Sequence, residues 1–182
     1  MAALAAVAAA VAGVAVGQAA GLAAVHRDDP LADVEAVEST RVFAAPPARV
    51  WPLLTDHELY GRLAPNLTTV EVISAAGEPL RRRCTNTAGD GWEETCTLWE
   101  DGRRFAVDVD TGHYPYPILL MRGLWQVDPH PAGSRVTMRF VYRAQPSVTG
   151  GLFAIVFRLL FTLALDRIFR GWRTRLSPQG SR

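Results

Sequence analysis

Apolar and polar residues alternate over much of the second half of the chain, from residue 81 to residue 143. Such alternation is typical of antiparallel strands that bury one face and expose the other. Turn-forming residues interrupt it at 89–91, 101–102 and 129–131, which predicts a series of hairpins. From 151 to 172 the apolar spacing becomes that of a helix. We therefore expect a curved sheet closed by an apolar helix, an arrangement that can enclose a cavity.

The expected order of elements is one strand, two short helices, six strands and one long helix. Pro46 and Pro47 suit the first turn of a helix, and Thr55 and Asp56 suit the cap of a second one. Because these helices do not alternate with strands, the order argues against a doubly wound parallel sheet. Predicted strands include 34–43, 67–75, 78–87, 92–100, 119–127 and 135–144, and the predicted helices are 48–54, 55–63 and 151–172.

The turns predict which residues face one another on the buried side of the sheet. By the same alternation Arg82 would also point inward, unless a bulge in its strand turns it away. Arg81 and Arg83 would lie on the solvated side. The predicted pairs are Cys84 with Cys96, Asn86 with Glu94, Leu98 with Phe105, Cys96 with Val107, Glu94 with Val109, Trp125 with Met138, Gly123 with Phe140, and Met121 with Tyr142.

The C-terminal helix has one narrow polar strip, made by Arg158, Thr162, Asp166 and Arg173 when the chain is wrapped at about 3.6 residues per turn. Most of its other positions up to Trp172 carry apolar side chains. So wide an apolar arc predicts burial on more than one side. The charged residues interrupt the stretch too often for a clean membrane span, so we expect a core helix.

The chain begins with 25 residues in which Gln18 is the only polar side chain. A bilayer crossing needs about 20 residues, but alanine dominates and inserts only marginally. No basic residue precedes the segment, as a secretory signal would require. A weak membrane anchor, a disordered or loosely helical extension, and a signal peptide all remain open. We expect three parts: the N-terminal segment 1–30, a folded domain 31–176, and a disordered tail 177–182.

The amino-acid composition limits the kinds of chemistry and partner that we expect for this protein. The 182 residues carry a net charge of +1, so no strong field points to nucleic acid. All 19 basic residues are arginine, which excludes Schiff-base chemistry on lysine and a phosphate-loop lysine. Two cysteines and four scattered histidines show no metal-ligand spacing. We expect neither a metal nor a cofactor, and we expect buried cysteine thiols in a reducing compartment rather than a disulfide.

Three stretches of the sequence resemble a known superfamily. They are Arg41-Val-Phe-Ala-Ala-Pro-Pro-Ala-Arg-Val-Trp-Pro-Leu-Leu-Thr-Asp56, Gly91-Trp-Glu-Glu-Thr-Cys-Thr-Leu-Trp-Glu-Asp-Gly-Arg-Arg-Phe105 and Arg135-Val-Thr-Met-Arg-Phe140. Together with the element order, they are similar to the polyketide cyclase and START-like (SRPBCC) superfamily, which includes the plant pollen-allergen fold. The resemblance covers residues 34–172. It implies an α+β helix-grip fold: an antiparallel sheet wrapped around the last helix, with a cavity for an apolar ligand.

Two inward-facing residues are candidates for chemistry. Glu94, among apolar walls, would have a raised pKa and could act as a general acid or base. It could also lie solvated at the mouth of the sheet, or turn outward beside Glu93 after a slip of register. Tyr142 could offer its hydroxyl to a ligand, although a packed tyrosine with a satisfied hydroxyl is the more frequent case.

A larger set of residues could contact an apolar ligand or simply fill the core. The segment from Tyr114 to Pro117 is stiffened by two prolines and could border the cavity entrance or serve as a plain connector. The candidate ligand-binding residues are Asn86, Trp92, Cys96, Phe105, Val107, Tyr114, Tyr116, Met121, Trp125, Met138, Phe140 and Leu160.

Three functions fit these observations. The first is a binding module for a small hydrophobic molecule or lipid, favoured because no complete catalytic set is visible. The second is a polyketide aromatase/cyclase or dehydrase, which the resemblance implies. The third is a quinone-binding or ribosome-associated interaction protein, types that the resemblance also implies. We expect a cytoplasmic protein, or one associated with a membrane through residues 1–25.

Overall fold

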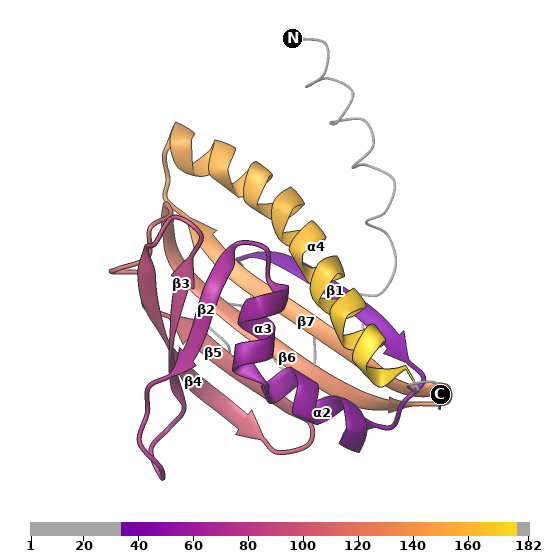
Figure 1. The fold of residues 1–182 in the computed structure, drawn as a ribbon. Helices are drawn as coiled ribbons and strands as arrows, with labels where there is room; N and C mark the ends of the chain where they lie inside the picture. Colours follow the sequence, from indigo (N-terminus) through magenta and orange to yellow (C-terminus); the bar gives the residue numbers. More distant parts are fainter. Residues whose placement is uncertain (1–33, 178–182) are drawn as a thin grey trace, which may run out of the picture. The chain divides into compact units, whose positions relative to one another are not determined.

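The computed structural model of the protein describes residues 34–177. One curled antiparallel sheet faces a long C-terminal helix, and two short helices lie near one end of the sheet (Figure 1). The predicted helix-grip order is confirmed. The elements are β1 (Glu35–Phe43), α2 (Pro47–Thr55), α3 (His57–Leu63), β2 (Leu67–Val72), β3 (Arg81–Asn86), β4 (Gly91–Glu100), β5 (Arg104–Val109), β6 (Ile118–His130), β7 (Gly133–Ala144) and α4 (Val148–Leu176).

The seven strands follow the order β1-β7-β6-β5-β4-β3-β2. Strands β2 to β7 are a run of neighbouring hairpins, and β1 joins the far edge by pairing antiparallel with β7. In the long β6–β7 hairpin the predicted register is confirmed. The observed pairs include Trp125 with Met138, Gly123 with Phe140, and Met121 with Tyr142.

The β4–β5 hairpin confirms the predicted register near one end and corrects it near the turn. Glu94 pairs with Val109 and Cys96 with Val107, as predicted, but the register shifts between Cys96 and Leu98. The predicted pair of Leu98 with Phe105 is therefore wrong. Such a shift inserts one extra residue and reverses the faces beyond it, so Trp99 becomes the partner of Phe105.

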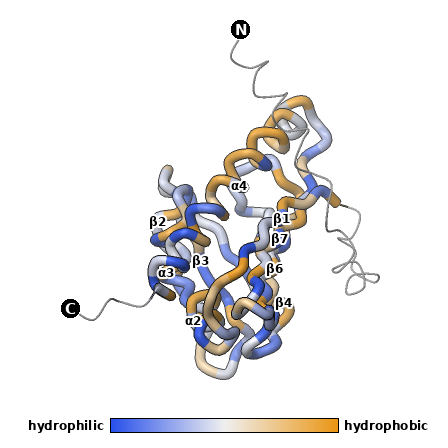
Figure 2. Tube along the Cα trace, turned by 90° about the vertical axis from the view of Figure 1, so that its right-hand side faces the viewer, coloured by the Kyte–Doolittle hydropathy of each residue, from blue (hydrophilic) through white to orange (hydrophobic). Residues whose placement is uncertain are grey.

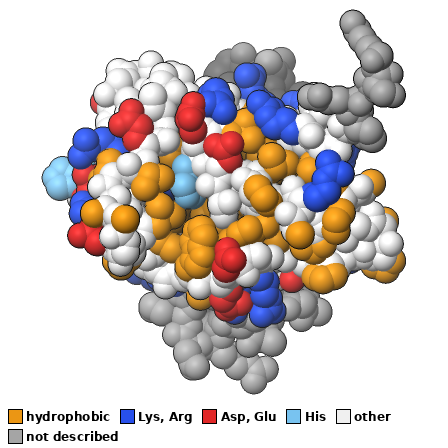
Figure 3. Space-filling view, turned by 60° about the horizontal axis from the view of Figure 1, so that its bottom comes forward, with side chains coloured by type: hydrophobic (Ala, Val, Ile, Leu, Met, Phe, Trp, Pro, Cys, Tyr) orange, Lys and Arg blue, Asp and Glu red, His pale blue; other side chains and the backbone are white. Residues whose placement is uncertain are grey.

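Trp99 joins an aromatic cluster at the α2 end of the sheet. Its ring centroid lies 5.6 Å from that of Phe105 and 5.6 Å from that of Trp51 in α2. The indole nitrogen of Trp51 donates a hydrogen bond to Asp101 in the β4–β5 turn, which ties the helix to the hairpin. Trp99 keeps 46% of its surface exposed. Figure 3 shows a face of the molecule on which hydrophobic side chains gather in the middle, with charged ones around them.

The β3–β4 hairpin has a different register from the predicted one. Cys84 pairs with Trp92 rather than Cys96, and Arg82, not Asn86, pairs with Glu94. The turn lies earlier than expected because the side-chain oxygen of Asn86 accepts hydrogen bonds from the backbone N–H groups of Ala88 and Asp90. Compared with the predicted register, each residue's partner on the opposite strand is displaced by an even number of residues. Glu94 and Cys84 therefore keep their inward faces, and both cysteines are free.

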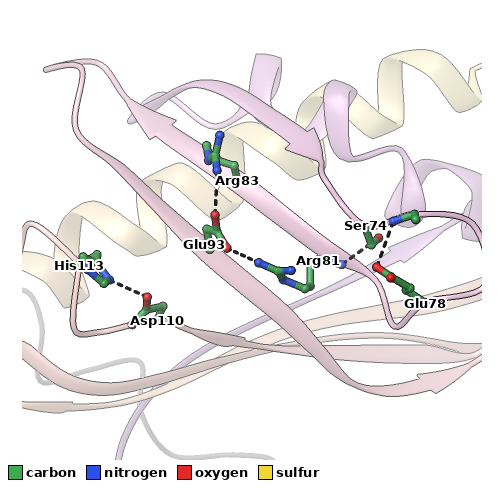
Figure 4. A network of polar contacts seen from close by, with 8 residues as sticks. Ser74, Glu78, Arg81, Arg83, Glu93, Asp110 and His113 are labelled. Atoms are coloured by element: carbon green, nitrogen blue, oxygen red, sulfur yellow. Dashed lines mark hydrogen bonds and ion pairs between the residues drawn. The ribbon is translucent and has the colours of Figure 1, made fainter.

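Arg82 points inward without a bulge in its strand, because no register shift interrupts β3 and β4. Its neighbours Arg81 and Arg83 lie on the outer face, where both make ion pairs with Glu93 at 2.6 and 2.8 Å (Figure 4). Beside them His113 contacts Asp110 at 2.8 Å. The expected solvated arginines are thus confirmed for the outer two. The strand that carries them, β3, is not at the edge of the sheet, because it pairs with β2 on one side and β4 on the other.

The two short helices start where the sequence indicates. Helix α2 has Pro47 in its first turn. Asp56 caps α3, because its carboxylate accepts a hydrogen bond from the backbone N–H of Leu59 at 2.8 Å. The buried face of α3 includes His57 and Tyr60.

Helix α4 begins at Val148, before the two glycines expected to precede it, and the Ser147 side chain caps it by accepting from the N–H of Gly150. Its second half is held in the core by Leu165, Ile168 and Trp172, each at most 1% exposed. The predicted burial on more than one side is wrong. One side of its first half is apolar and exposed, and Figure 2 shows that hydrophobic residues are frequent along α4.

The N-terminal segment 1–30 and the tail from 178 lie outside the described residues, and so do the predictions made for them. Across residues 34–177, no helix combines the length and the apolar character that a bilayer crossing needs.

Candidate functional site

A small cavity lies between the inner face of the sheet and α4. Its volume is about 30 Å³, which is room for no more than a few water molecules. Residues from α3, β2 to β7 and α4 line it. The apolar part of the lining includes Val107, Val109, Met121, Phe140, Phe161 and Leu165.

A buried ion pair also lines this cavity. Arg82 is 2% exposed and Glu94 is 8% exposed. The Arg82 guanidinium donates from Nε to one Glu94 oxygen at 2.7 Å, and its Nη2 lies 2.6 Å from the same oxygen. The other Glu94 oxygen accepts from the indole nitrogen of Trp92 at 2.9 Å. Each oxygen of the carboxylate thus has a hydrogen-bond or ion-pair partner.

Arg82 has further partners that keep it charged and fix its plane. Its carbon Cζ lies 5.0 Å from the ring centroid of Trp125 and 5.5 Å from that of Tyr60, within the range of cation–π attraction. Burial alone would lower the pKa of Arg82, but the adjacent Glu94 carboxylate raises it. The guanidinium therefore stays protonated although water scarcely reaches it.

His57 completes the polar cluster from α3. Its Nδ1 lies 3.0 Å from Nη1 of Arg82. Burial, reinforced by the positive charge of Arg82, lowers the pKa of His57 to about 4. The ring is neutral near pH 7, so Nδ1 accepts a hydrogen bond from Arg82 and the other ring nitrogen carries the proton.

Two tyrosines belong to the same lining. Tyr60 comes from α3, and Tyr114 packs edge-on against Trp92 with 4.9 Å between ring centroids. Burial raises the pKa of both hydroxyls, so both remain protonated and could donate a hydrogen bond. Among the described residues no cluster of three potential metal ligands is present.

Part of the candidate set from the sequence lies at the cavity. Glu94, Trp92, Val107, Tyr114, Met121 and Phe140 all line it. The surroundings predicted for Glu94 are wrong, however. A guanidinium and an indole N–H contact its carboxylate instead of apolar walls.

Other candidates lie elsewhere. Asn86 supports the β3–β4 turn, and Leu160 points to the exposed side of α4 with 58% of its surface accessible. Tyr142 is buried outside the lining, with its hydroxyl 3.5 Å from the Ala154 carbonyl oxygen, and burial raises its pKa to about 12. The remaining candidates outside the lining are Cys96, Phe105, Tyr116, Trp125 and Met138.

The sequence reasoning missed Arg82, His57 and Tyr60 as members of the site. The signal for Arg82 was present, because its position in the alternation places it on the inner face. For His57 and Tyr60 the sequence offered only a short helix. The docking of α3 against the sheet brings them to Arg82.

The chain matches the family described as polyketide cyclase / dehydrase and lipid transport over residues 35–175. It therefore belongs to that family, as its motifs indicated. No curated protein sequence matches it significantly.

Solved structures share the fold. TTHA0849 from Thermus thermophilus is 24% identical with a TM-score of 0.64, covering 81% of this chain and 100% of its own. The Zhui aromatase/cyclase from Streptomyces sp. R1128 is 20% identical with a TM-score of 0.64, covering 82% and 99%. Norcoclaurine synthase from Thalictrum flavum is 16% identical with a TM-score of 0.61, covering 81% and 97%. At these identities the likeness concerns the fold.

Proposed function

We propose that the protein binds a small hydrophobic molecule between the sheet and α4, with an acceptor group of that molecule against Arg82. The observation that carries this proposal is one buried ion pair in the lining of an otherwise largely apolar cavity. Arg82 makes hydrogen bonds to Glu94 and His57. Among the described residues these leave N–H groups on its terminal nitrogens for a ligand oxygen.

Binding requires the cavity to enlarge. Sites for small molecules usually have volumes of about 300–1,000 Å³, whereas the volume of this cavity is only about 30 Å³. Phe161 and Tyr114 are the side chains we expect to move, because both line the cavity and are only partly buried. Association should therefore be slow, with a rate that levels off at high ligand concentration.

The test uses two acids, palmitate and anthraquinone-2-carboxylate, and the methyl ester of each. Native mass spectrometry gives the stoichiometry and tryptophan fluorescence follows binding, since Trp92 lines the cavity. One molecule per chain is expected, with the acids bound more tightly than the esters because Arg82 favours a negative oxygen.

A cavity-filling variant tests the location. Ala164 lines the cavity from α4 and is 6% exposed, so Ala164→Leu should weaken binding about tenfold or more. Ala132→Leu, at an exposed turn position, is the control and should bind like the unaltered protein. Equal binding by both variants, or no uptake of any of the four compounds, would reject the proposal.

A catalytic role is the second candidate, because Glu94 and Arg82 both line the cavity. The Glu94 carboxylate could accept a proton from a carbon next to a carbonyl, and Arg82 could stabilise the oxygen that gains negative charge. This would suit the cyclisation or dehydration of a polyketide-like chain. The check is product formation from a poly-β-ketone thioester: Glu94→Gln should abolish it, and undiminished product would remove Glu94 from the reaction.

A further inference from the structure

The outer side of the first half of α4 is a continuous aliphatic surface. When the helix is wrapped at about 3.6 residues per turn, seven exposed aliphatic side chains fall on one side, each between 44% and 92% accessible. We name this set the aliphatic stripe. Its members are Val148, Leu152, Ile155, Val156, Leu159, Leu160 and Leu163.

The opposite side of the same half packs on the sheet. Phe157 lies 4.9 Å from Tyr142 and Phe161 lies 4.5 Å from Phe140, measured between ring centroids. The helix is therefore fixed by its aromatic side while the aliphatic stripe faces away. Contiguous exposed apolar surface of this kind marks an interaction site.

The same outer side changes character in the second half of α4. There it carries Arg167, Arg170 and Arg173, all exposed. None of the three makes an ion pair within the part of the chain that the structure describes. The one acidic residue of α4, Asp166, is neutralised by an ion pair with Arg41 of β1.

We propose that this side of α4 docks the protein on the surface of a bilayer that contains anionic lipid. The aliphatic stripe enters the boundary between headgroups and acyl chains, and the three arginines contact lipid phosphates. Apolar helix surface buried at the headgroup boundary contributes to interfacial binding, and each arginine near an anionic surface strengthens attachment. The proposal concerns a different surface from the cavity and does not depend on ligand binding.

A bilayer fits these observations better than a protein partner does. Protein interfaces concentrate their affinity in Trp, Tyr and Arg residues seated in pockets. The stripe contains only aliphatic side chains on a single convex helix, and the charge beside it has one sign. A fluid surface of acyl chains and phosphates matches such a side without requiring shape complementarity.

The experiment measures co-flotation of the full chain with vesicles. Vesicles of phosphatidylcholine alone are compared with vesicles containing about 30% phosphatidylglycerol, since anionic lipid attracts the arginines. The unaltered protein should float with the anionic vesicles and detach as salt is raised.

Two double variants test the two halves of the surface. Leu159→Gln/Leu163→Gln should lower the partition coefficient about tenfold or more, while Val72→Gln/Leu119→Gln, at sites 52% and 50% exposed elsewhere, should not change it. Arg170→Gln/Arg173→Gln should weaken binding to anionic vesicles about tenfold. Its control is Arg81→Gln/Arg83→Gln, which removes the same charge from the outer face of the sheet. Circular dichroism checks that each variant is folded.

Two results would overturn the proposal. If the stripe variant floats as the unaltered protein does, the attachment is carried by another part of the chain. If light scattering shows a dimer that the stripe variant dissociates, and neither protein floats, the surface serves a second copy of the chain.

Discussion

Removing one member of the buried Arg82–Glu94 pair should destabilise the protein far more than removing the outer pair beside it. The Arg82→Met change leaves the Glu94 carboxylate buried without a positive charge beside it, although the Trp92 N–H still donates to it. The Glu94→Leu change leaves the guanidinium with His57 and the rings of Tyr60 and Trp125, none of which carries a negative charge. Each should lower the free energy of unfolding by about 3–5 kcal/mol, because an uncompensated charge remains buried.

The double variant Arg82→Met/Glu94→Leu contains no buried charge at this position. Its main remaining defect is the Trp92 N–H, which loses its acceptor at a cost of about 1–3 kcal/mol. The double loss should therefore fall below the sum of the single losses by at least about 2 kcal/mol. Urea unfolding at pH 7, followed by circular dichroism and tryptophan fluorescence, measures the four free energies. Where a single variant does not fold, Arg82→Lys and Glu94→Gln replace it.

The adjacent outer pair is a matched control. Arg81 and Glu93 belong to the same two strands and lie 2.6 Å apart, but their side chains are 48% and 33% exposed. Water already solvates both charges, so the cycle Arg81→Met, Glu93→Leu and both together should be additive within experimental error. Additive losses for the buried pair as well would refute our reasoning about Arg82 and Glu94.

Three further predictions concern other parts of the chain. The pKa of His57 falls from 6.5 to about 4 on folding, so between these pH values the unfolded chain binds one more proton than the folded chain. The stabilisation should be fully present above pH 6.5, and the free energy of unfolding should fall by about 3 kcal/mol toward pH 4. Urea titrations measure this dependence, and His57→Gln should flatten it. Gly133 has a φ of 125°, and a Cβ at this position would lie 2.3 Å from a backbone oxygen, so Gly133→Ala should lower the free energy of unfolding by about 3 kcal/mol. The control is Gly77→Ala, at a φ of 89° with open space around it, which should lower that free energy by about 1 kcal/mol. Cys84 is 1% exposed and burial raises its pKa, so a disulfide reagent should label it only at the rate of unfolding, and rapid labelling in the folded protein would contradict its burial.

Much of the sheet could be predicted because its turns are short and its alternation is regular. The β6–β7 register follows from the turn and from the requirement that Trp125, Met138 and Phe140 be buried together. At the β3–β4 turn the same reasoning failed. Two glycines flank Asp90, but the side chain of Asn86 decides where the chain reverses. Such a local hydrogen bond has no signature in the hydrophobic pattern.

The candidate site was predicted in its apolar part and in Glu94, but its electrostatics were not. An inward arginine looked like an error of register, because a lone buried guanidinium would be too costly. Arg82 is tolerated because a carboxylate from β4 and a neutral imidazole from α3 both meet it. Arg82 and these two partners come from three separate elements, so no spacing in the sequence connects them.

The sequence by itself determined the order of elements, the inward face of nearly every strand and the apolar character of the last helix, because these depend on periods of two and about 3.6 residues that neighbouring positions define. The tertiary structure alone decided which side of α4 is covered, how far the space beneath it is filled, and that Arg82, Glu94 and His57 meet. Those outcomes depend on how distant segments pack, and packing is a property of volumes and contacts that a pattern of polar and apolar letters does not contain.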